Sequence, residues 1–268
     1  MHRIVLTRQP GQAGLLEEEL TGLGVGIELL PLLDFALPAD TTALTAAKDK
    51  ARDGAYDWIV LTSPNAVRAL NKLTFFAEPL PVKWGMVGGG TAAVFAAHAS
   101  QEADFVAEHN QSGKGLVAEF PAPDPQGCNA VLLPVSDIAS TTVQDGLGAN
   151  AYTVERVNAY RTVPASLNLP QHQRLLPAAT VPYPVHAVED FAAAAASAAA
   201  VVLTSPSNAR LYAAAAEDFP ALGLPPLLAM GEPTARAMTA IGLPITAVLP
   251  KPDVHSVYRW LTEHLPPA

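Results

Sequence analysis

The tetrapeptide Leu-Thr-Ser-Pro occurs twice in the chain, at Leu61 to Pro64 and at Leu203 to Pro206. Each copy follows an apolar run and precedes a segment with helical periodicity. The serine oxygen can cap free backbone N–H groups, and proline is tolerated at the first helical position because its missing N–H would have no partner there. The repeat therefore predicts two strand-turn-helix units, and with them two similar halves of one α/β chain.

A second pair of segments supports the duplication. Gly88 and Thr91 match Gly231 and Thr234 at an offset of 143 residues, against 142 for the tetrapeptides. A duplicated chain repeats whole units of structure, not single turns. We therefore expect the same succession of strands and helices in both halves.

Short apolar runs rich in residues that favour β-structure predict the strands, and helical periodicity fills the gaps between them. This alternation is typical of parallel sheets covered by helices. The stretch from Pro164 to Pro184 contains five prolines and predicts an irregular connection. The predicted strands are Arg3 to Thr7, Val25 to Leu33, Asp57 to Thr62, Lys83 to Val87, Ala130 to Leu133, Tyr152 to Tyr160, Ala200 to Thr204 and Pro226 to Met230.

Composition restricts the class of protein. The 268 residues suffice for one large domain or two of ordinary size. No uninterrupted apolar run is long enough to span a bilayer, and the start of the chain lacks the apolar region of a secretion signal, so we expect a cytoplasmic protein that does not bind membranes. The formal charge of -9 opposes binding to nucleic acid, which requires a basic surface.

The common signatures of catalysis are missing from the sequence. The triplet Gly88 to Gly90 lacks the spacing of a dinucleotide-binding turn, there is no phosphate-binding P-loop, and the histidines form no metal-binding motif. We therefore expect no dinucleotide or nucleoside-triphosphate site and no metal. What remains is a pair of helix N-termini with hydroxyl side chains, which can bind carboxylate or phosphate at the carboxyl ends of strands. A serine before proline is often only a helix cap, so a purely structural role stays open.

The two tetrapeptides belong to a set of five segments that together span nearly the whole chain. These segments are Val60 to Val67, Val87 to Ala92, Val154 to Val163, Val202 to Asn208 and Met230 to Ala235. In this order they resemble the uroporphyrinogen-III synthase family. The turns Val5 to Arg8 and Gln111 to Leu116 are similar to that family as well.

The resemblance implies a particular division into domains. It implies two similar parallel-sheet α/β domains, flavodoxin-like or Rossmann-like, joined by a two-stranded antiparallel linker. One domain would be discontinuous and combine residues 1–33 with 164–268, and the other would hold residues 34–161. The chain would cross between them near residues 30–36 and 157–163. The repeated sequence and the folded domain would then be different units.

The resemblance also implies an activity. Members of the family cyclise hydroxymethylbilane to uroporphyrinogen III, with loss of water and inversion of the last pyrrole ring, ring D, in tetrapyrrole and haem biosynthesis. They use no cofactor, and we expect a monomer. The departing hydroxyl needs a proton, which leaves a reactive azafulvene. Tyr160 matches the tyrosine regarded as most important in the family, and a phenol with an ordinary pKa of about 10 keeps a proton to donate at neutral pH.

Further residues match positions that line the family's cleft or are suitable partners for substrate carboxylates. They carry hydroxyl, amide or basic groups, or are glycines in turns at helix starts. These predicted substrate-binding residues are Arg8, Ser63, Asn65, Gly88, Thr91, Ser112, Lys114, Ser205, Ser207, Gly231 and Thr234.

Two features depart from the family. Val135 and Ser140 stand in a turn where relatives often carry arginines, and residues 164–200 form a proline-rich and alanine-rich stretch without a recognisable counterpart. The loss of arginines leaves open either weaker binding or a relative that no longer catalyses. The alternative function is therefore a noncatalytic two-domain module that binds a tetrapyrrole or another small anion.

Overall fold

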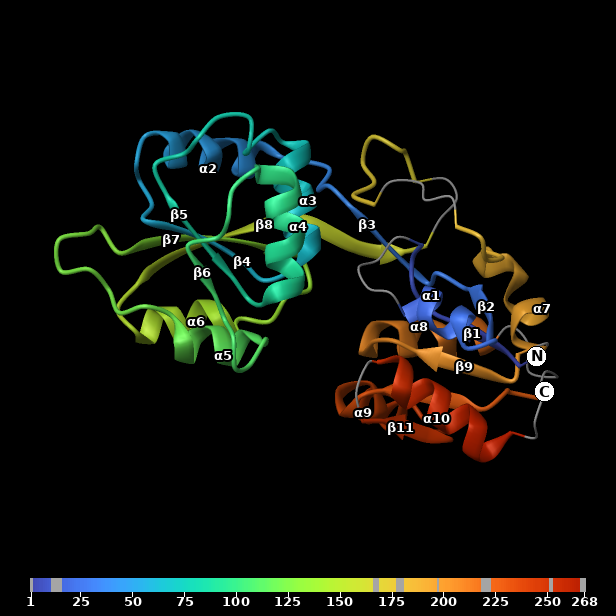
Figure 1. The fold of residues 1–268 in the computed structure, drawn as a ribbon. Coiled ribbons are helices and arrows are strands. Elements are labelled where there is room, and N and C mark those ends of the chain that lie inside the picture. The colour runs from blue at the N-terminus through green and yellow to red at the C-terminus, as the bar shows by residue number, and fades with distance from the viewer. Residues whose placement is uncertain are drawn as a thin grey trace. The chain divides into compact units, whose positions relative to one another are not determined.

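The computed structural model describes residues 2–10, 16–165, 169–176, 181–196, 198–217, 223–250 and 253–265. The chain forms two compact units. Unit 1 comprises Met1–Asp34, Val163–Leu169 and Pro177–Ala268, and unit 2 comprises Phe35–Thr162 and Pro170–Leu176. Each unit contains one sheet with helices on both faces (Figure 1). Within the described ranges, every helix is too short or too polar to cross a membrane.

The sheet of unit 1 has the strand order β11-β10-β9-β1-β2, and its neighbouring strands pair in parallel. The strands are β1 (Arg3–Leu6), β2 (Gly26–Leu29), β9 (Ala200–Leu203), β10 (Leu227–Met230) and β11 (Ala247–Leu249). Helices α1 and α10 pack on one face, and α7, α8 and α9 pack on the other. These helices are α1 (Leu16–Gly22), α7 (Phe191–Ala196), α8 (Pro206–Glu217), α9 (Glu232–Ala240) and α10 (Val254–His264), and the short 3-10 helix η1 (Val188–Asp190) precedes α7.

The sheet of unit 2 has the order β3-β8-β7-β4-β5-β6, and the pairs from β8 to β6 are parallel. Its strands are β3 (Leu33–Ala36), β4 (Trp58–Leu61), β5 (Lys83–Met86), β6 (Phe105–Val106), β7 (Ala130–Ser136) and β8 (Thr153–Pro164). Helices α2, α3 and α4 cover one face and α5 and α6 the other (Figure 1). They are α2 (Thr42–Arg52), α3 (Pro64–Lys72), α4 (Gly89–Ala99), α5 (Gly113–Glu119) and α6 (Thr142–Ala149).

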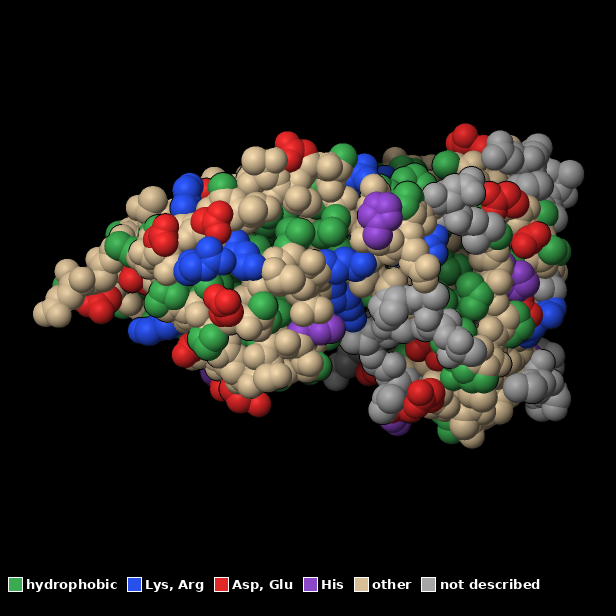
Figure 2. Space-filling view, turned by 90° about the horizontal axis from the view of Figure 1, so that it is seen from above, with side chains coloured by type: hydrophobic (Ala, Val, Ile, Leu, Met, Phe, Trp, Pro, Cys, Tyr) green, Lys and Arg blue, Asp and Glu red, His purple; other side chains and the backbone are tan. Residues whose placement is uncertain are grey.

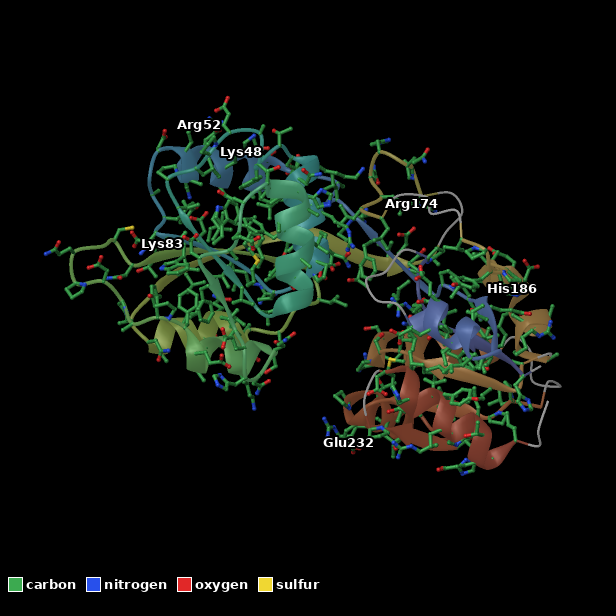
Figure 3. All side chains as sticks on the ribbon, viewed as in Figure 1. Lys48, Arg52, Lys83, Arg174, His186 and Glu232 are labelled. Atoms are coloured by element: carbon green, nitrogen blue, oxygen red, sulfur yellow. The ribbon has the colours of Figure 1, made fainter. Side chains whose placement is uncertain are left out.

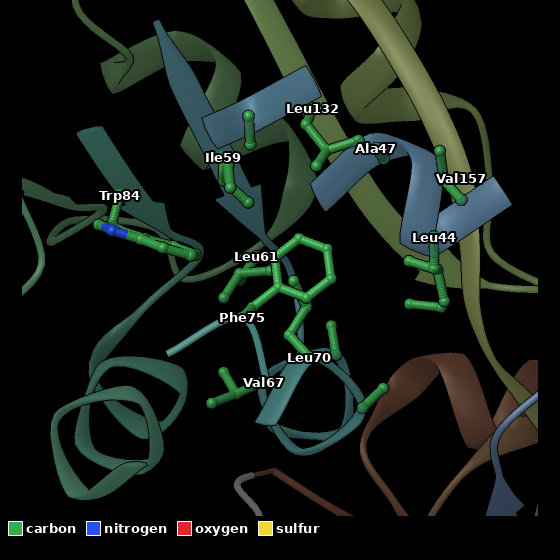
Figure 4. Close-up of a cluster of buried hydrophobic side chains, with 14 of the residues drawn as sticks. Leu44, Ala47, Ile59, Leu61, Val67, Leu70, Phe75, Trp84, Leu132 and Val157 are labelled. Carbon is green, nitrogen blue, oxygen red and sulfur yellow. The ribbon is translucent and has the colours of Figure 1, made fainter. Parts of the chain in front are cut away.

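The continuous apolar run of β4 is explained by burial on both faces of the sheet. Successive side chains of a strand point to opposite faces, so Ile59 and Leu61 enter the core under α2, α3 and α4 (Figure 4). Trp58 and Val60 enter the second core, under α5 and α6. A strand of this kind needs no polar alternation, which is why the sequence shows an uninterrupted run.

Five strands of the unit 2 sheet have the same spatial order as the strands of unit 1, β3 being additional, but the chain passes through them in a different sequence. In unit 2, the segment β7-α6-β8 occupies the place that β1-α1-β2 occupies in unit 1, and β4, β5 and β6 correspond to β9, β10 and β11. The prediction of an α/β protein with mostly parallel sheets is confirmed. The order of the equivalent strands along the chain differs. The pair β1 and β2 comes first in unit 1, whereas the equivalent pair, β7 and β8, comes last in unit 2.

Several predicted strand boundaries were wrong. Residues 25–33 were expected to form one strand, but β2 ends at Leu29 and β3 begins at Leu33. Pro31 lies between the two strands and has no N–H to donate to a ladder. The predicted strand at Ala130 to Leu133 instead continues to Ser136. The short strands β6 and β11 were not predicted, because two or three residues give no periodic signal.

The phenol of Tyr212 gives a test of core energetics. Tyr212 is fully buried beside Phe191, and its hydroxyl has no hydrogen-bond partner among the residues described here. An unpaired buried hydroxyl costs about 1–3 kcal/mol. We expect Tyr212→Phe to leave the urea midpoint of unfolding unchanged or to raise it by the equivalent of about 1 kcal/mol.

Tyr56→Phe is the matched comparison. The hydroxyl of Tyr56 donates to Oε2 of Glu155 over 2.8 Å, so its removal should lower the midpoint. A drop for Tyr212→Phe as large as that for Tyr56→Phe would show that the Tyr212 hydroxyl has a partner in solution.

Candidate functional site

The carboxyl edge of the unit 2 sheet collects the starts of three helices. Because β4, β5 and β6 are parallel neighbours, the turns that follow them lie at the same edge. Ser63 caps α3 after β4, Gly88 precedes α4 after β5, and Ser112 caps α5 after β6. In both serines the side-chain oxygen accepts a backbone N–H bond from the first helical turn. This edge therefore presents backbone N–H groups and the positive ends of helix dipoles.

Tyr160 of β8 joins this edge through a direct contact with Ser63. The two hydroxyl oxygens are 3.0 Å apart, although the residues are far apart in sequence. Tyr160 is 8% exposed, and its ring packs edge-on against Phe35. Burial raises the pKa of the Tyr160 phenol above its ordinary value, against the opposing hydrogen bond from Ser63. The phenol therefore carries its proton at neutral pH.

A β-bulge at the end of β7 brings a second group of polar side chains to Tyr160. The register between β7 and β8 shifts between Val135 and Ser136, so that Ser136 pairs with Tyr160. The Ser136 hydroxyl lies 2.9 Å from Oδ1 of Asp137, to which it donates, and 3.1 Å from the Thr162 hydroxyl. Bulges of this kind redirect side chains and occur often beside active sites.

The edge near the bulge is where the direction of chain progression reverses. From β4 the chain proceeds outward through β5 and β6, whereas from β7 it proceeds to β8 on the other side. Open α/β sheets bind ligands at such a switch point, outside the carboxyl ends of the strands. Ser63 follows β4 and Ser136 ends β7, so the polar cluster lies at the switch point of this sheet.

Ser136, Asp137 and Thr162 were missed by sequence reasoning. The predicted strand ended at Leu133, whereas β7 continues to Ser136. In the structure β4 pairs with β7 only at Val131 and Leu132, and Pro134 lies beyond that pairing. The sequence signal was a polar Ser-Asp pair at the end of a buried strand. It could be recognised only if the strand was known to continue to Ser136.

The turn after β5 and the loop before α5 are packed together. A Cβ atom at Gly88 would lie 2.6–2.7 Å from the side chain of Gln111, so only glycine fits without a shift. At Gly115 a Cβ would collide with the backbone oxygen of Asn110. The structure thus brings the predicted residues Gly88 and Ser112 close in space, whereas Lys114 is exposed on α5.

The other predicted residues of unit 2 lie on α3 and α4. The side-chain oxygen of Asn65 accepts a bond from Arg68 at 2.9 Å, within the first turns of α3. Thr91 is 3% exposed, and its backbone N–H donates to the oxygen of Gly88. Thr91 therefore contributes to the start of α4 from a buried position.

The carboxyl edge of the unit 1 sheet has a related construction. Oγ of Ser205 accepts from the Asn208 N–H at 3.1 Å at the start of α8, and Ser207 lies in the same turn. Gly231 precedes α9 with φ of 86°, a conformation that favours glycine. The hydroxyl of Thr234 donates to the carbonyl of Met230 at 3.2 Å. The four predicted residues thus lie at two neighbouring helix starts.

The basic side chains differ in where they lie. Arg68 lies in the first turns of α3, where it bonds to Asn65, and Lys114 lies on α5. Arg8 forms an ion pair with Glu17 at 3.1 Å, with only 11% of its side chain exposed. Figure 3 shows Lys48 and Arg52 on α2 and Lys83 at the start of β5, which is the amino end of that strand. These three cations therefore do not belong to the carboxyl edge of unit 2.

The family resemblance led us to expect arginines in the turn after the predicted strand Ala130 to Leu133, at the positions of Val135 and Ser140. Val135 is buried in the core, and Ser140 is exposed. Arg156 of β8 donates to the carbonyls of Ala139 at 2.7 Å and Ser140 at 3.4 Å. An arginine from the neighbouring strand thus holds this turn through its backbone.

Glu119 holds the loop that carries Ser112. Its carboxylate accepts backbone N–H bonds from Glu108, His109 and Asn110 at 2.8, 3.3 and 3.1 Å. These bonds, chiefly the one from Glu108, lower the pKa of Glu119 to about 2. The ionised form is therefore the one that the folded loop binds.

We expect this loop to make stability depend on pH in a defined direction. The contribution of Glu119 should be complete above its ordinary pKa of 4.5 and should disappear as the pH falls towards about 2. The difference in unfolding midpoint between the wild type and Glu119→Gln should shrink over that interval. Glu102→Gln, at an exposed position, is the control, and a constant difference down to pH 2 would contradict the assignment.

Comparisons with known proteins identify the family of this chain. A family model described as uroporphyrinogen-III synthase HemD matches residues 15–259. The chain is 31% identical over 172 residues to the chloroplastic uroporphyrinogen-III synthase of Oryza sativa subsp. japonica. The aligned region covers 60% of this chain and 53% of that protein. It is 29% identical over 128 residues to the uroporphyrinogen-III synthase of Synechococcus elongatus, over 45% of this chain and 46% of that protein. The chain thus spans about half the length of the curated relatives it matches.

The fold is also shared with a solved structure. Uroporphyrinogen-III synthetase from Helicobacter pylori 26695 superposes with a TM-score of 0.61 at 15% identity, over 98% of this chain and 99% of that one. At this identity the likeness shows a common fold. Because the family model extends over most of the sequence, the chain belongs to the uroporphyrinogen-III synthase family.

Proposed function

We propose that the chain cyclises hydroxymethylbilane to uroporphyrinogen III, with loss of water and inversion of ring D, in tetrapyrrole biosynthesis. The observation that carries this proposal is the 3.0 Å pair of Tyr160 and Ser63 at the switch point of the unit 2 sheet. It places a protonated phenol beside a helix N-terminus. A proton donor next to an anion-binding helix start suits a substrate that has both a leaving hydroxyl and carboxylates.

The first step requires an acid. The Tyr160 proton passes to the hydroxymethyl oxygen, the C–O bond breaks, and water leaves. The electron pair of the ring nitrogen compensates for the lost bond, so the product is an azafulvenium cation, and Tyr160 becomes a phenolate. Ser63 lies within hydrogen-bond distance and can donate to the phenolate oxygen as its charge forms.

The second step decides which isomer forms. A carbon of ring D attacks the methylene carbon, and after rearrangement through a spiro intermediate a ring proton is lost, which can return to Tyr160. Because the free substrate closes spontaneously to the other isomer, the protein must favour one closure by orientation. The helix starts at Ser63, Gly88 and Ser112 in unit 2, and at Ser205 and Gly231 in unit 1, are the groups that we assign to the substrate carboxylates.

The connection between the domains is part of the proposal. We assign residues 1–33 with 164–268 to one domain and residues 34–161 to the other, joined by β3 and β8 as an antiparallel pair. Two contacts support the antiparallel direction. The Ala165 N–H donates to the Leu32 carbonyl at 2.9 Å, and Nε of Arg161 donates to the Leu37 carbonyl at 3.4 Å. The partner residue number falls on one strand as it rises on the other.

A monomer is sufficient for this chemistry. Tyr160, Ser63, Ser136 and Asp137 all belong to one chain and to one unit. We therefore propose that the active species is the monomer, and sedimentation equilibrium at assay concentration should show a single species of 28.0 kDa.

Isomer analysis tests the activity. We expect the wild type to convert freshly made hydroxymethylbilane to uroporphyrinogen III, and Tyr160→Phe to form that isomer about a hundredfold more slowly, because the acid is lost. Tyr56→Phe, which removes another hydrogen-bonded phenol of unit 2, should leave the rate unchanged. The products are separated as porphyrins by chromatography after oxidation.

Two results would contradict the proposal. Isomer I alone from the wild type would favour the noncatalytic binding module. Full activity of Tyr160→Phe, with an unchanged circular dichroism spectrum, would remove Tyr160 from the acid role.

Ionic strength gives a second test. The protein has a formal charge of -9, and on the visible face of unit 2 acidic and basic side chains are interspersed (Figure 2). Long-range repulsion should therefore oppose a polycarboxylate substrate, while local N–H and hydroxyl contacts bind it. We expect KM to fall several-fold as salt is raised from about 20 to 150 mM, where screening shortens to about 8 Å. A KM that rises steadily from the lowest salt would contradict this.

A further inference from the structure

The carboxylate of Asp137 is rigidly held beside Tyr160. Its Oδ1 accepts from the Ser136 hydroxyl at 2.9 Å, the Ile138 N–H at 3.1 Å and the Thr162 N–H at 3.0 Å. Its own N–H donates to the carbonyl of Tyr160 at 3.0 Å. Hydrogen bonds to this one oxygen thus fix the Asp137 carboxylate from both β7 and β8. Because Asp137 is exposed, the carboxylate is open to a ligand.

A fixed anion at this place opposes the binding of the substrate. The other groups at this edge that we assign to the carboxylates are neutral hydroxyls and backbone N–H groups. Asp137 instead adds a negative charge close to the proton donor. Such a group raises the free energy of the bound polycarboxylate, so a contribution to substrate affinity does not account for it.

The negative charge of Asp137 becomes favourable only when positive charge develops on the substrate. Loss of water from the substrate turns one pyrrole and its methylene carbon into a cation, while the bound carboxylates do not change. A preorganised carboxylate near that carbon stabilises the transition state more than the ground state, which raises kcat. Because Asp137 is already oriented by three hydrogen bonds, little reorganisation is needed when the cation forms.

The neighbouring side chain fits the same ligand. Ile138 is 62% exposed, which is the largest exposed fraction among the large apolar side chains that the structure describes. A pyrrole ring resting on this apolar surface would lie next to the Asp137 carboxylate. The loop after β7 thus combines an apolar contact with a negative charge, the two properties that suit a flat organic cation.

We propose that Asp137 is a further catalytic residue, whose carboxylate stabilises the azafulvenium cation formed when Tyr160 protonates the leaving hydroxyl. This inference rests on the proposed cyclisation. In that step the C–O bond breaks with its electrons leaving on the water oxygen. When the ring D carbon bonds to the methylene carbon, the positive charge passes to ring D and is removed when a proton is lost. Asp137 exchanges no proton and forms no bond.

Two substitutions separate charge from geometry. Asp137→Asn keeps an oxygen that can accept the three bonds but removes the charge, whereas Asp137→Glu keeps the charge and displaces it. We expect Asp137→Asn to lower kcat for uroporphyrinogen III about tenfold and to lower KM, because repulsion of the substrate is relieved. Asp137→Glu should retain a higher kcat than Asp137→Asn.

Asp145→Asn is the matched control, since it removes the same charge from an exposed position on α6. It should leave kcat unchanged. If Asp137 only positions the loop, Asp137→Asn will keep full kcat and Asp137→Glu will lose it, which overturns the inference. If Asp137→Asn does not fold, kcat of Asp137→Glu is compared with kcat of Asp137→Ala. The electrostatic role requires the glutamate variant to be faster, and a lower kcat for Asp137→Glu would refute it. A wild type that forms only isomer I would instead reject the proposed function itself.

Discussion

The parallel pairing of β7 with both of its neighbours is the constraint on which the candidate site depends. β4 and β8 belong to distant parts of the chain, and β7 lies between them. Parallel pairing requires their carboxyl ends to emerge at one edge, which brings Ser63 after β4 into contact with Tyr160 on β8. Neither side chain is unusual by itself. Their meeting at the switch point gives the phenol a partner and an anion-binding helix start.

The bulge in the β7–β8 ladder adds a second level of control. Without a register shift, Ser136 would be paired one residue earlier on β8, and its side chain would meet different neighbours. With the shift, Ser136 and Asp137 are anchored to Thr162 and to the backbone of Tyr160. One irregular residue in an otherwise regular sheet thus determines which polar groups surround the proton donor.

The local turns of this chain were accessible to sequence reasoning, but the contacts between distant segments were not. The cap at Ser63 follows from Ser-Pro before a helical pattern, and the turn at Gly231 follows from a glycine between strand and helix. Tyr160 was found only through its family resemblance, because an aromatic residue on a strand is usually a packing residue. Asp137 was missed, since its position depends on a bulge and on a strand that continues past Pro134. The bonds that the N–H groups of residues 108–110 donate to the Glu119 carboxylate likewise join segments that no local pattern connects.

The kinds of groups at the candidate site are related to the two charges of the reacting substrate, its carboxylates and the cation formed during the reaction. A basic cleft would bind a polycarboxylate tightly, but it would also disfavour a cation on the same molecule. Hydroxyls, backbone N–H groups and helix dipoles bind carboxylates without placing full positive charges beside the reacting carbon. Asp137 adds a negative charge close to Tyr160, of the sign that stabilises the cation left behind when water departs. At the turn after β7, Arg156 donates to the backbone carbonyl of Ala139, so this guanidinium holds the turn through its backbone.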